Sequence, residues 1–362
     1  MKIVYVGRFP LHIQSGHIDL ISDIAATGHE AFYIIALRFK DYIRNKFTRV
    51  LSNDAEFTGI NYRPFLRVTR KMKEYEKKCI LSTLRKNGLI ERNVVIVSNN
   101  METCSYLKDR LPSEVSVIYH IFDRYSEYYN LTDEEKVSFD EREFEVIKKV
   151  DGVLCVSQKL LAEAKELNNN SFWFPGAVRK NQIVMPGAIN TSSKKVGMIS
   201  NELSRIDWPL MCNIAMILED YSIELIGQND LADLGEYPSN IRFIGKVPFV
   251  ELPKYVRDWR VGLALYEENR FNEYCCPLKY FEYSSLDIPT ISTTIPEGEV
   301  FANLYPEMIF LADDAKSIAA HVRNITTANE INDYTRLARD HNWSARAEQL
   351  IAIINKVKKN TF

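Results

Sequence analysis

The sequence has no long apolar run and no segment that resembles a leader peptide. No window of its 362 residues approaches the ~20 consecutive apolar residues that a membrane-spanning helix needs. Its opening residues, MKIVYVG, enter an apolar strand pattern directly, without the basic stretch and cleavage site of a signal peptide. We therefore expect a cytoplasmic protein.

Several metal, redox and nucleotide motifs are also missing. The six cysteines form no CxxC pair, and the six histidines form no HExxH pattern, so we predict no metal site. Adjacent Cys275 and Cys276 could indicate a metal or redox site, but no histidine neighbours them, and buried thiols are the simpler interpretation. The absence of G-x-G-x-x-G and of G-x-x-x-x-G-K-[ST] argues against a nicotinamide fingerprint and a P-loop.

The charge that is present is unevenly distributed. The net charge is −2, yet residues 38–92 contain 15 Lys or Arg against six Asp or Glu. This basic segment is either a set of solvated helix faces or a surface for an anionic partner, such as the inner face of the cell membrane or a lipid-linked acceptor. Nucleic acid is a weaker candidate, because the chain as a whole is not basic and contains no reading motif.

The first half of the chain alternates short apolar strands with amphipathic helices. Gly28 is placed to end a helix over Ile18–Thr27, and a charged helix is expected over Asp133–Val150. The expected strands are Lys2–Val6, Ala31–Ile35, Asn93–Ser98, Val115–Tyr119 and Gly152–Val156. Such alternation predicts βαβ units and a parallel sheet.

The pattern restarts after a polar join over Ala177–Lys194. Helices are expected at Asp207–Leu218, Val250–Trp259 and Pro277–Ser285, and strands at Lys195–Ile199, Ile223–Ile226, Ile241–Ile244, Val261–Leu265, Pro289–Thr293 and Met308–Leu311. We therefore predict an α/β protein of two Rossmann-like domains, 1–178 and 190–342, with a cleft between them and a closing helix, 343–362, that packs back across the domains. Ligands of such sheets bind at the carboxyl ends of the strands.

The segment CPLKYFEY, residues 276–283, contains a candidate phosphate site. Pro277 suits a first helical turn, and a helix that begins there presents N–H groups and the positive end of its dipole. Lys279 adds a full positive charge, and Glu282 lies on the same face one turn later, where it could accept hydrogen bonds from ribose hydroxyls. The alternative is an ordinary amphipathic helix with both side chains in water.

This segment resembles a known family. PLKYFEYSSLDIPTISTTIPE is similar to the donor-binding stretch of GT-B glycosyltransferases, and KKVGMISNELSRIDWPLM, IELIGQND, NIRFIGKVPFVELPKYVRDWRVGLALY and HNWSARAEQL resemble other parts of their second domain in the expected order. The resemblance implies a GT-B fold and a hexosyltransferase of polysaccharide or glycolipid biosynthesis. It also implies a nucleotide-sugar donor (a UDP-sugar is favoured), a carbohydrate or lipid-linked acceptor, and no metal or other cofactor.

One departure from the family pattern bears on the mechanism. Many retaining members have a glutamate seven residues before the second one, but here that place holds Cys275. The sequence thus leans toward an inverting subgroup that resembles the xanthan-type glucuronosyltransferases, in which an N-terminal-domain aspartate is the base. Asp123, in VSVIYHIFDRYSEYY, is our candidate base, although it could instead cap the next helix. His120, Arg124 and Glu127 are its neighbouring rivals.

The resemblance suggests further donor-side residues. Arg205 could hold the diphosphate, or it could pair with Asp207 on the surface. Tyr266 could contact the base or diphosphate, or it could be a packed aromatic at the rim. Leu278, in the PLK element, and the backbone near Val247 complete the predicted nucleotide site.

The long first loop, residues 7–17, is typical of the acceptor side of GT-B enzymes. Gly16 and His17 are our candidates there, although a capping or core histidine is the commoner role. Three alternatives stay open: a retaining transferase on the same fold, a nucleotide-sugar epimerase of GT-B fold, and a two-lobed solute-binding protein, which the absent signal peptide disfavours.

Overall fold

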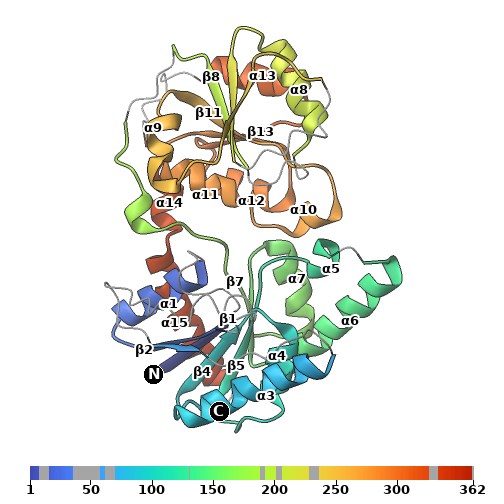
Figure 1. Ribbon diagram of the computed structural model, residues 1–362, viewed down its shortest axis with the longest axis vertical. Helices are drawn as coiled ribbons and strands as arrows, with labels where there is room; N and C mark the ends of the chain where they lie inside the picture. Colours follow the sequence, from blue (N-terminus) through green and yellow to red (C-terminus); the bar gives the residue numbers. More distant parts are fainter. Residues whose placement is uncertain are drawn as a thin grey trace. The chain divides into compact units, whose positions relative to one another are not determined.

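The computed structural model describes residues 1–7, 16–35, 58–61, 70–129, 131–187, 192–200, 206–227, 236–325 and 333–360. These residues form two compact units (Figure 1). The first contains residues 1–175 together with 343–362, and the second contains residues 176–342. The closing helix thus belongs to the first unit, although it follows the second in sequence.

The first unit is built on a seven-stranded parallel sheet of order β3-β2-β1-β4-β5-β6-β7. Except for Lys2 at the start of β1, every residue of the three central strands β1, β4 and β5 is buried, as expected of strands covered on both faces. The strands are β1 (Lys2–Gly7), β2 (Glu30–Ile35), β3 (Thr58–Asn61), β4 (Val94–Ser98), β5 (Ser116–Ile121), β6 (Gly152–Cys155) and β7 (Ser171–Trp173).

The helices of the first unit cover both faces of this sheet, with α1 beside α15 and with α4 packed against α3 and α6 (Figure 1). They are α1 (Gly16–Ala26), α3 (Arg70–Lys86), α4 (Met101–Lys108), α5 (Tyr125–Tyr128), α6 (Asp133–Lys149), α7 (Gln158–Leu167) and α15 (Trp343–Asn360). Gly28 has a φ of +83° after α1, which confirms the predicted helix end. A capping box between Thr132 and Glu135 starts α6.

The second unit repeats the plan with a six-stranded parallel sheet of order β10-β9-β8-β11-β12-β13, typical of a Rossmann fold. Its strands are β8 (Lys195–Ile199), β9 (Ser222–Ile226), β10 (Ile241–Gly245), β11 (Trp259–Ala264), β12 (Thr290–Ser292) and β13 (Ile309–Leu311). Its helices are α8 (Trp208–Ile217), α9 (Leu252–Val256), α10 (Arg270–Tyr274), α11 (Leu278–Ser285), α12 (Pro296–Leu304), α13 (Ala315–Asn324) and α14 (Arg336–Asp340), with short 3₁₀ turns at Lys180–Gln182 and Phe249–Glu251. The prediction of an α/β fold with two Rossmann-like domains is confirmed.

The predicted helix Val250–Trp259 is wrong in extent. A 3₁₀ turn precedes α9, which ends at Val256, and Trp259 already begins β11. The indole N–H of Trp259 donates to Glu224 Oε2 at 2.8 Å, and its ring lies so close to Gly197 that a Cβ there would be 2.0 Å away. Packing on the sheet therefore decides the conformation of Trp259, which helical periodicity alone could not indicate.

Candidate functional site

Helix α11 begins one residue later than its sequence predicts. Pro277 is the N-cap, with φ −75° and ψ 80°, and Leu278 is the first helical residue. No side chain caps this end. The N–H groups of Leu278 and Tyr280 bond to the backbone carbonyls of Cys276 and Pro277. Two of the N–H groups at this end are thus bonded within the backbone, and the positive end of the helix dipole carries no side-chain cap.

Three predicted donor-side residues come together at this end of α11. The Lys279 ammonium lies 5.3 Å from the centroid of the Tyr266 ring, and both side chains are half-buried. Burial raises the pKa of the Glu282 carboxyl, and the positive charge of Lys279 opposes this rise. Lys279 and Glu282 thus share a partly desolvated environment, and their roles in nucleotide binding stay a prediction.

Tyr266 is held by its backbone just beyond the carboxyl end of β11. Its N–H donates to Thr293 Oγ1 at 2.7 Å, and that hydroxyl donates to the Tyr266 carbonyl at 2.9 Å. An isolated antiparallel bridge joins Tyr266 to Ile206, which follows the carboxyl end of β8. The backbone of Tyr266 is therefore fixed by segments that follow β8 and β12, and its ring faces Lys279.

Tyr283 occupies the fork where β8 and β11 separate. The paired register of these strands ends at Gly197 and Gly262. Beyond this point the Tyr283 hydroxyl accepts the Ile199 N–H at 3.0 Å and donates to the Leu263 carbonyl at 2.7 Å. This is the topological switch point of the sheet, where ligands of doubly wound folds bind. Sequence analysis missed Tyr283, although its place one turn after Lys279 was a usable signal.

The structure gives fewer contacts for the other residues of the predicted donor site. Leu278 is 53% exposed and packs over Gly176, where a Cβ would lie 2.4 Å from Leu278 Cδ2. Val247 follows β10, an edge strand that two further strands separate from β11, and its place in the nucleotide site stays a prediction. Arg205 lies outside the described residues.

On the acceptor side, Gly16 and His17 open α1 in the first unit. A Cβ on Gly16 would be 2.1 Å from the Trp343 ring, so this glycine allows α15 to pack against α1. His17 is 7% exposed, stacks on Tyr5 and meets Phe122 edge-on. Burial lowers the pKa of His17 to about 4, so the ring is neutral near pH 7. Residues 8–15 of the predicted loop lie outside the described part of the chain.

Asp123 lies after the carboxyl end of β5 and is half-buried. The N-cap of α5 is Arg124, one residue after Asp123, and its side chain makes no cap hydrogen bond. His120 is 1% exposed, and burial, reinforced by His17, holds its pKa well below the usual range. Glu127 is paired with Lys136 at 2.6 Å. The role of Asp123 as the base stays a prediction, as do the roles of its rivals His120, Arg124 and Glu127.

Arg124 anchors the segment that carries Asp123. Its guanidinium is 3% exposed and pairs with Glu163, with Asp140 at 3.6 Å and with Glu143 at 3.7 Å. Glu143 also accepts the Tyr119 hydroxyl at 2.6 Å. Burial raises the pKa of Glu143, against the hydrogen bond from Tyr119 and the charge of Arg124. Buried charges of this kind are tolerated only when they are paired.

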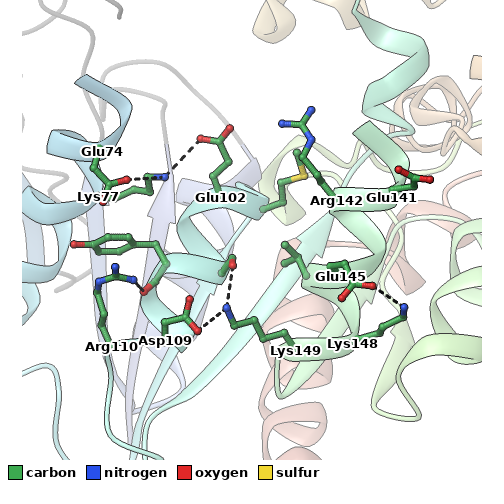
Figure 2. Close-up of a pocket in the computed structure, with 14 residues that line it drawn as sticks. Glu74, Lys77, Glu102, Asp109, Arg110, Glu141, Arg142, Glu145, Lys148 and Lys149 are labelled. Atoms are coloured by element: carbon green, nitrogen blue, oxygen red, sulfur yellow. Dashed lines mark hydrogen bonds and ion pairs between the residues drawn. The ribbon is translucent and has the colours of Figure 1, made fainter. Parts of the chain in front are cut away.

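A separate pocket of about 770 Å³ lies on one face of the first sheet, between α3, α4 and α6 (Figure 2). Acidic and basic side chains line it in equal numbers, and most are paired: Lys77 with Glu74 and Glu102, and Lys149 with Asp109. None of the predicted site residues lines it. Its mutually neutralised walls match no ligand of the predicted chemistry.

None of the helices in the described ranges is long and apolar enough to cross a membrane. Within the same ranges, no group of three or more His, Cys, Asp or Glu side chains is arranged to hold a metal ion.

The chain was compared with known proteins. Residues 209–352 match a family model described as glycosyl transferase-like. No curated protein matches the chain.

Solved structures match over nearly the whole chain at low identity. Sucrose-phosphate synthase from Thermosynechococcus elongatus is 13% identical, with 99% of each chain covered and a TM-score of 0.69. Anabaena HepE in complex with UDP is 12% identical, with 98% of this chain and all of that chain covered and a TM-score of 0.65. A mutant of S. aureus TarM in complex with fondaparinux, α-GlcNAc-glycerol and UDP is 10% identical, with the same coverage and TM-score.

These matches agree with the geometry of the two sheets. The likeness to a xanthan-type glucuronosyltransferase stays a prediction. The chain has the fold of the GT-B glycosyltransferases, and its segment 209–352 is glycosyl transferase-like in sequence.

Proposed function

We propose that this protein is a glycosyltransferase that moves a sugar from a nucleoside diphosphate donor to a hydroxyl of a carbohydrate or lipid-linked acceptor. The observation that carries the proposal is the uncapped start of α11, where Lys279 lies against Tyr266 and beside Glu282. A helix N-terminus with one added cation suits a diphosphate, whose charge needs donors and positive potential. The UDP bound to HepE and TarM makes a UDP-sugar the first donor to test.

The roles of the donor-side residues follow from their chemistry. Lys279 neutralises the diphosphate as negative charge develops on it, so that no metal ion is required for this purpose. Glu282 accepts hydrogen bonds from the ribose hydroxyls, for which a carboxylate supplies two acceptor oxygens. Tyr266 fixes the position of the Lys279 side chain through a cation–π contact.

Asp123 supplies the base in the proposed reaction. Its carboxylate accepts the proton of the acceptor hydroxyl while that oxygen forms the new bond to the anomeric carbon. The bond from that carbon to the diphosphate oxygen breaks, and its electron pair leaves with the nucleoside diphosphate. One displacement of this kind inverts the anomeric configuration. Cys275, rather than a carboxylate, stands where many retaining enzymes have a glutamate.

A nucleotide-dependent thermal shift tests the donor site. The wild-type chain is heated with UDP, GDP, dTDP and CMP and with their sugars, and the best ligand at 100 times its dissociation constant should add about 2.7 kcal/mol. Lys279→Ala should weaken binding of that ligand at least about tenfold, the effect of about 1.4 kcal/mol. Lys254→Ala, an exposed lysine on α9, is the matched control and should leave the shift unchanged.

Two results would contradict the proposal. A Lys279→Ala protein that keeps the full shift would show that the nucleotide binds elsewhere. If no nucleotide stabilises the wild-type protein, the proposed donor site does not exist. Glu282→Gln separates the two parts of the site, because it should weaken UDP binding while leaving binding of inorganic pyrophosphate unchanged.

A further inference from the structure

A run of tyrosine rings begins two residues after Asp123. The Tyr125 and Tyr129 rings stack at 6.3 Å with an angle of 22° between their planes, and Tyr128 meets Tyr129 edge-on at 5.5 Å. Phe139 from α6 supports Tyr129 at 6.1 Å. Tyr128 and Tyr129 are 50% and 46% exposed, which is unusual for two adjacent large aromatic side chains. We call this pair the tyrosine platform.

Tyr125 connects the platform to the candidate base. It follows Asp123 by two residues and stacks on Tyr129, and its pKa is raised by burial, next by the Asp123 carboxylate and then by Tyr129. The side chain of Asn99, which follows the carboxyl end of β4, opposes the rise. Asp123, the partly buried Tyr125 and the exposed platform thus follow one another in the segment just after the carboxyl end of β5, and ring contacts join Tyr125 to the platform.

The charge around the platform limits what it can bind. Residues 123–143 contain eight Asp or Glu and three Lys or Arg. Three of the acids, Asp133, Glu134 and Glu135, are in the first turn of α6. An anionic lipid surface or an anionic glycan would be repelled here, in contrast to the basic segment 38–92. An uncharged ligand with an apolar face and a polar rim meets no such penalty.

We propose that the tyrosine platform binds an uncharged sugar ring of the acceptor, so that the acceptor is a glycan of at least two sugar residues. This rests on the proposed function, because it takes Asp123 as the base. A pyranose ring has one face of C–H groups, which packs on an aromatic ring, and a rim of hydroxyls, which can bond to tyrosine hydroxyls. The sugar that reacts lies at Asp123, and the next one along the glycan lies on the platform.

Saturation-transfer NMR on the whole protein with saturating UDP tests this inference. The probes are three neutral trisaccharides, namely cellotriose, maltotriose and chitotriose, with trigalacturonate as the anionic counterpart. At least one neutral probe should bind, and trigalacturonate should not. The double variant Tyr128→Ala/Tyr129→Ala should bind that neutral probe about tenfold more weakly, whereas Tyr128→Phe/Tyr129→Phe should stay within about threefold.

The controls separate this proposal from the proposed function. Tyr75→Ala removes a tyrosine of similar exposure, 47%, from α3 of the same unit and should leave sugar binding unchanged. The UDP-dependent thermal shift should be equal in all variants. If none of the four nucleotides or their sugars stabilises the wild-type protein, the proposed function is contradicted, whatever the trisaccharides do.

Three outcomes would overturn the platform itself. They are failure of all three neutral trisaccharides to bind, equal binding to the wild type and the double alanine variant, and binding of trigalacturonate in preference to the neutral probes. Vesicles of phosphatidylcholine with phosphatidylglycerol supply a fourth arm. If the double alanine variant loses vesicle binding and keeps sugar binding, the platform contacts a membrane and the proposal is wrong.

Discussion

The two sheets share one strand order, yet they close their switch points differently. In the first unit the pairing of β1 with β4 continues to Val6 and Ser98, and the Ser98 hydroxyl donates to the Val6 carbonyl at 3.0 Å. In the second unit the pairing of β8 with β11 stops at Gly197, and Tyr283 from α11 bridges the two strands. A helix thus reaches into the second fork, whereas the first is closed by its own strands.

The charge at the two carboxyl ends differs as well. In the first unit, two buried neutral imidazoles, His17 and His120, pack on Phe122, the residue before Asp123, and the Arg124 guanidinium pairs with three carboxylates. In the second unit a lysine stands at the start of a helix. The same topology therefore presents a carboxylate, Asp123, in one unit and a cation, Lys279, in the other. The following four predictions test this contrast, in order of decreasing effect.

Replacing the carboxylate of the first unit should have the largest effect. Asp123→Asn should lower sugar transfer by about 10²–10⁴-fold, because the amide cannot accept the proton of the acceptor hydroxyl. The thermal shift by nucleotide should persist, since Lys279 belongs to the other unit. Asp133→Asn, an exposed aspartate on α6, is the control for turnover. Full turnover in Asp123→Asn would assign the base to another residue.

Removal of Arg124 should destabilise the first unit strongly. Arg124→Met leaves the carboxylates of Glu143 and Asp140 without their buried cation, a change that typically costs about 3–5 kcal/mol. The folded-state pKa of Glu143 is already raised, so its contribution to stability falls as pH rises through that pKa. Without Arg124 the pKa of Glu143 rises further. The loss in free energy of unfolding caused by Arg124→Met should therefore grow from acid toward neutral pH.

Urea unfolding at several pH values measures this deficit. Arg142→Met, an exposed arginine on α6, is the matched control and should stay within about 0.5 kcal/mol of the wild type. A constant deficit at all pH values would show that packing, rather than charge, is what Arg124 provides.

His17 should make the first unit sensitive to acid. The pKa of His17 is about 4 in the folded protein against 6.5 for an ordinary histidine. Because the folded-state value is lowered, its contribution to stability is complete above pH 6.5 and is lost as pH falls toward 4, by roughly 3 kcal/mol. His17→Phe should remove this loss. The free energy of unfolding of the variant should therefore fall less than that of the wild type as pH falls.

Chemical unfolding of both proteins at pH 7 and pH 4.5 measures the gain. His321→Gln in α13 of the second unit is the control, because it leaves the His17 environment intact. Parallel pH curves for the wild type and His17→Phe would contradict the burial of a neutral imidazole at this position.

The switch point of the second unit should show the smallest of the four effects. Tyr283→Phe removes the hydroxyl that joins the Ile199 N–H to the Leu263 carbonyl, and the loss of these two hydrogen bonds should cost about 1–3 kcal/mol. Tyr255→Phe, at an exposed tyrosine on α9, is the control. Hydrogen exchange should show faster exchange of the β8 amides in Tyr283→Phe than in the wild type. Unchanged protection of β8 would show that Tyr283 does not stabilise the fork between β8 and β11.

Sequence patterns predicted much of the fold because buried parallel strands are continuous apolar runs. They failed where the pattern was weak. The four-residue strand β3 and the strongly charged helix α3 lie in the basic segment, for which no element was predicted. The three-residue strand β7 was missed as well, because three residues show no periodicity.

The candidate site was predictable in part for the same reason. Lys279 and Glu282 are three apart on one helix, so their proximity follows from helical geometry. The contact between Lys279 and Tyr266 joins residues from different elements, and so does the network of Arg124 with α6 and α7. No local pattern indicates such contacts, because they depend on how strands and helices pack.

By itself, the sequence determined the alternation of strands and helices, the two successive parallel sheets and the position of a lysine in the first turn of α11. Hydrophobic periodicity and helix-start chemistry are local properties, and each can be read within a few residues. Only the tertiary structure decided that Tyr283 closes the second fork, that His17 is a buried neutral ring and that the tyrosines after Asp123 form an exposed platform. Those outcomes depend on burial and on contacts between distant residues, which exist only once the chain has packed.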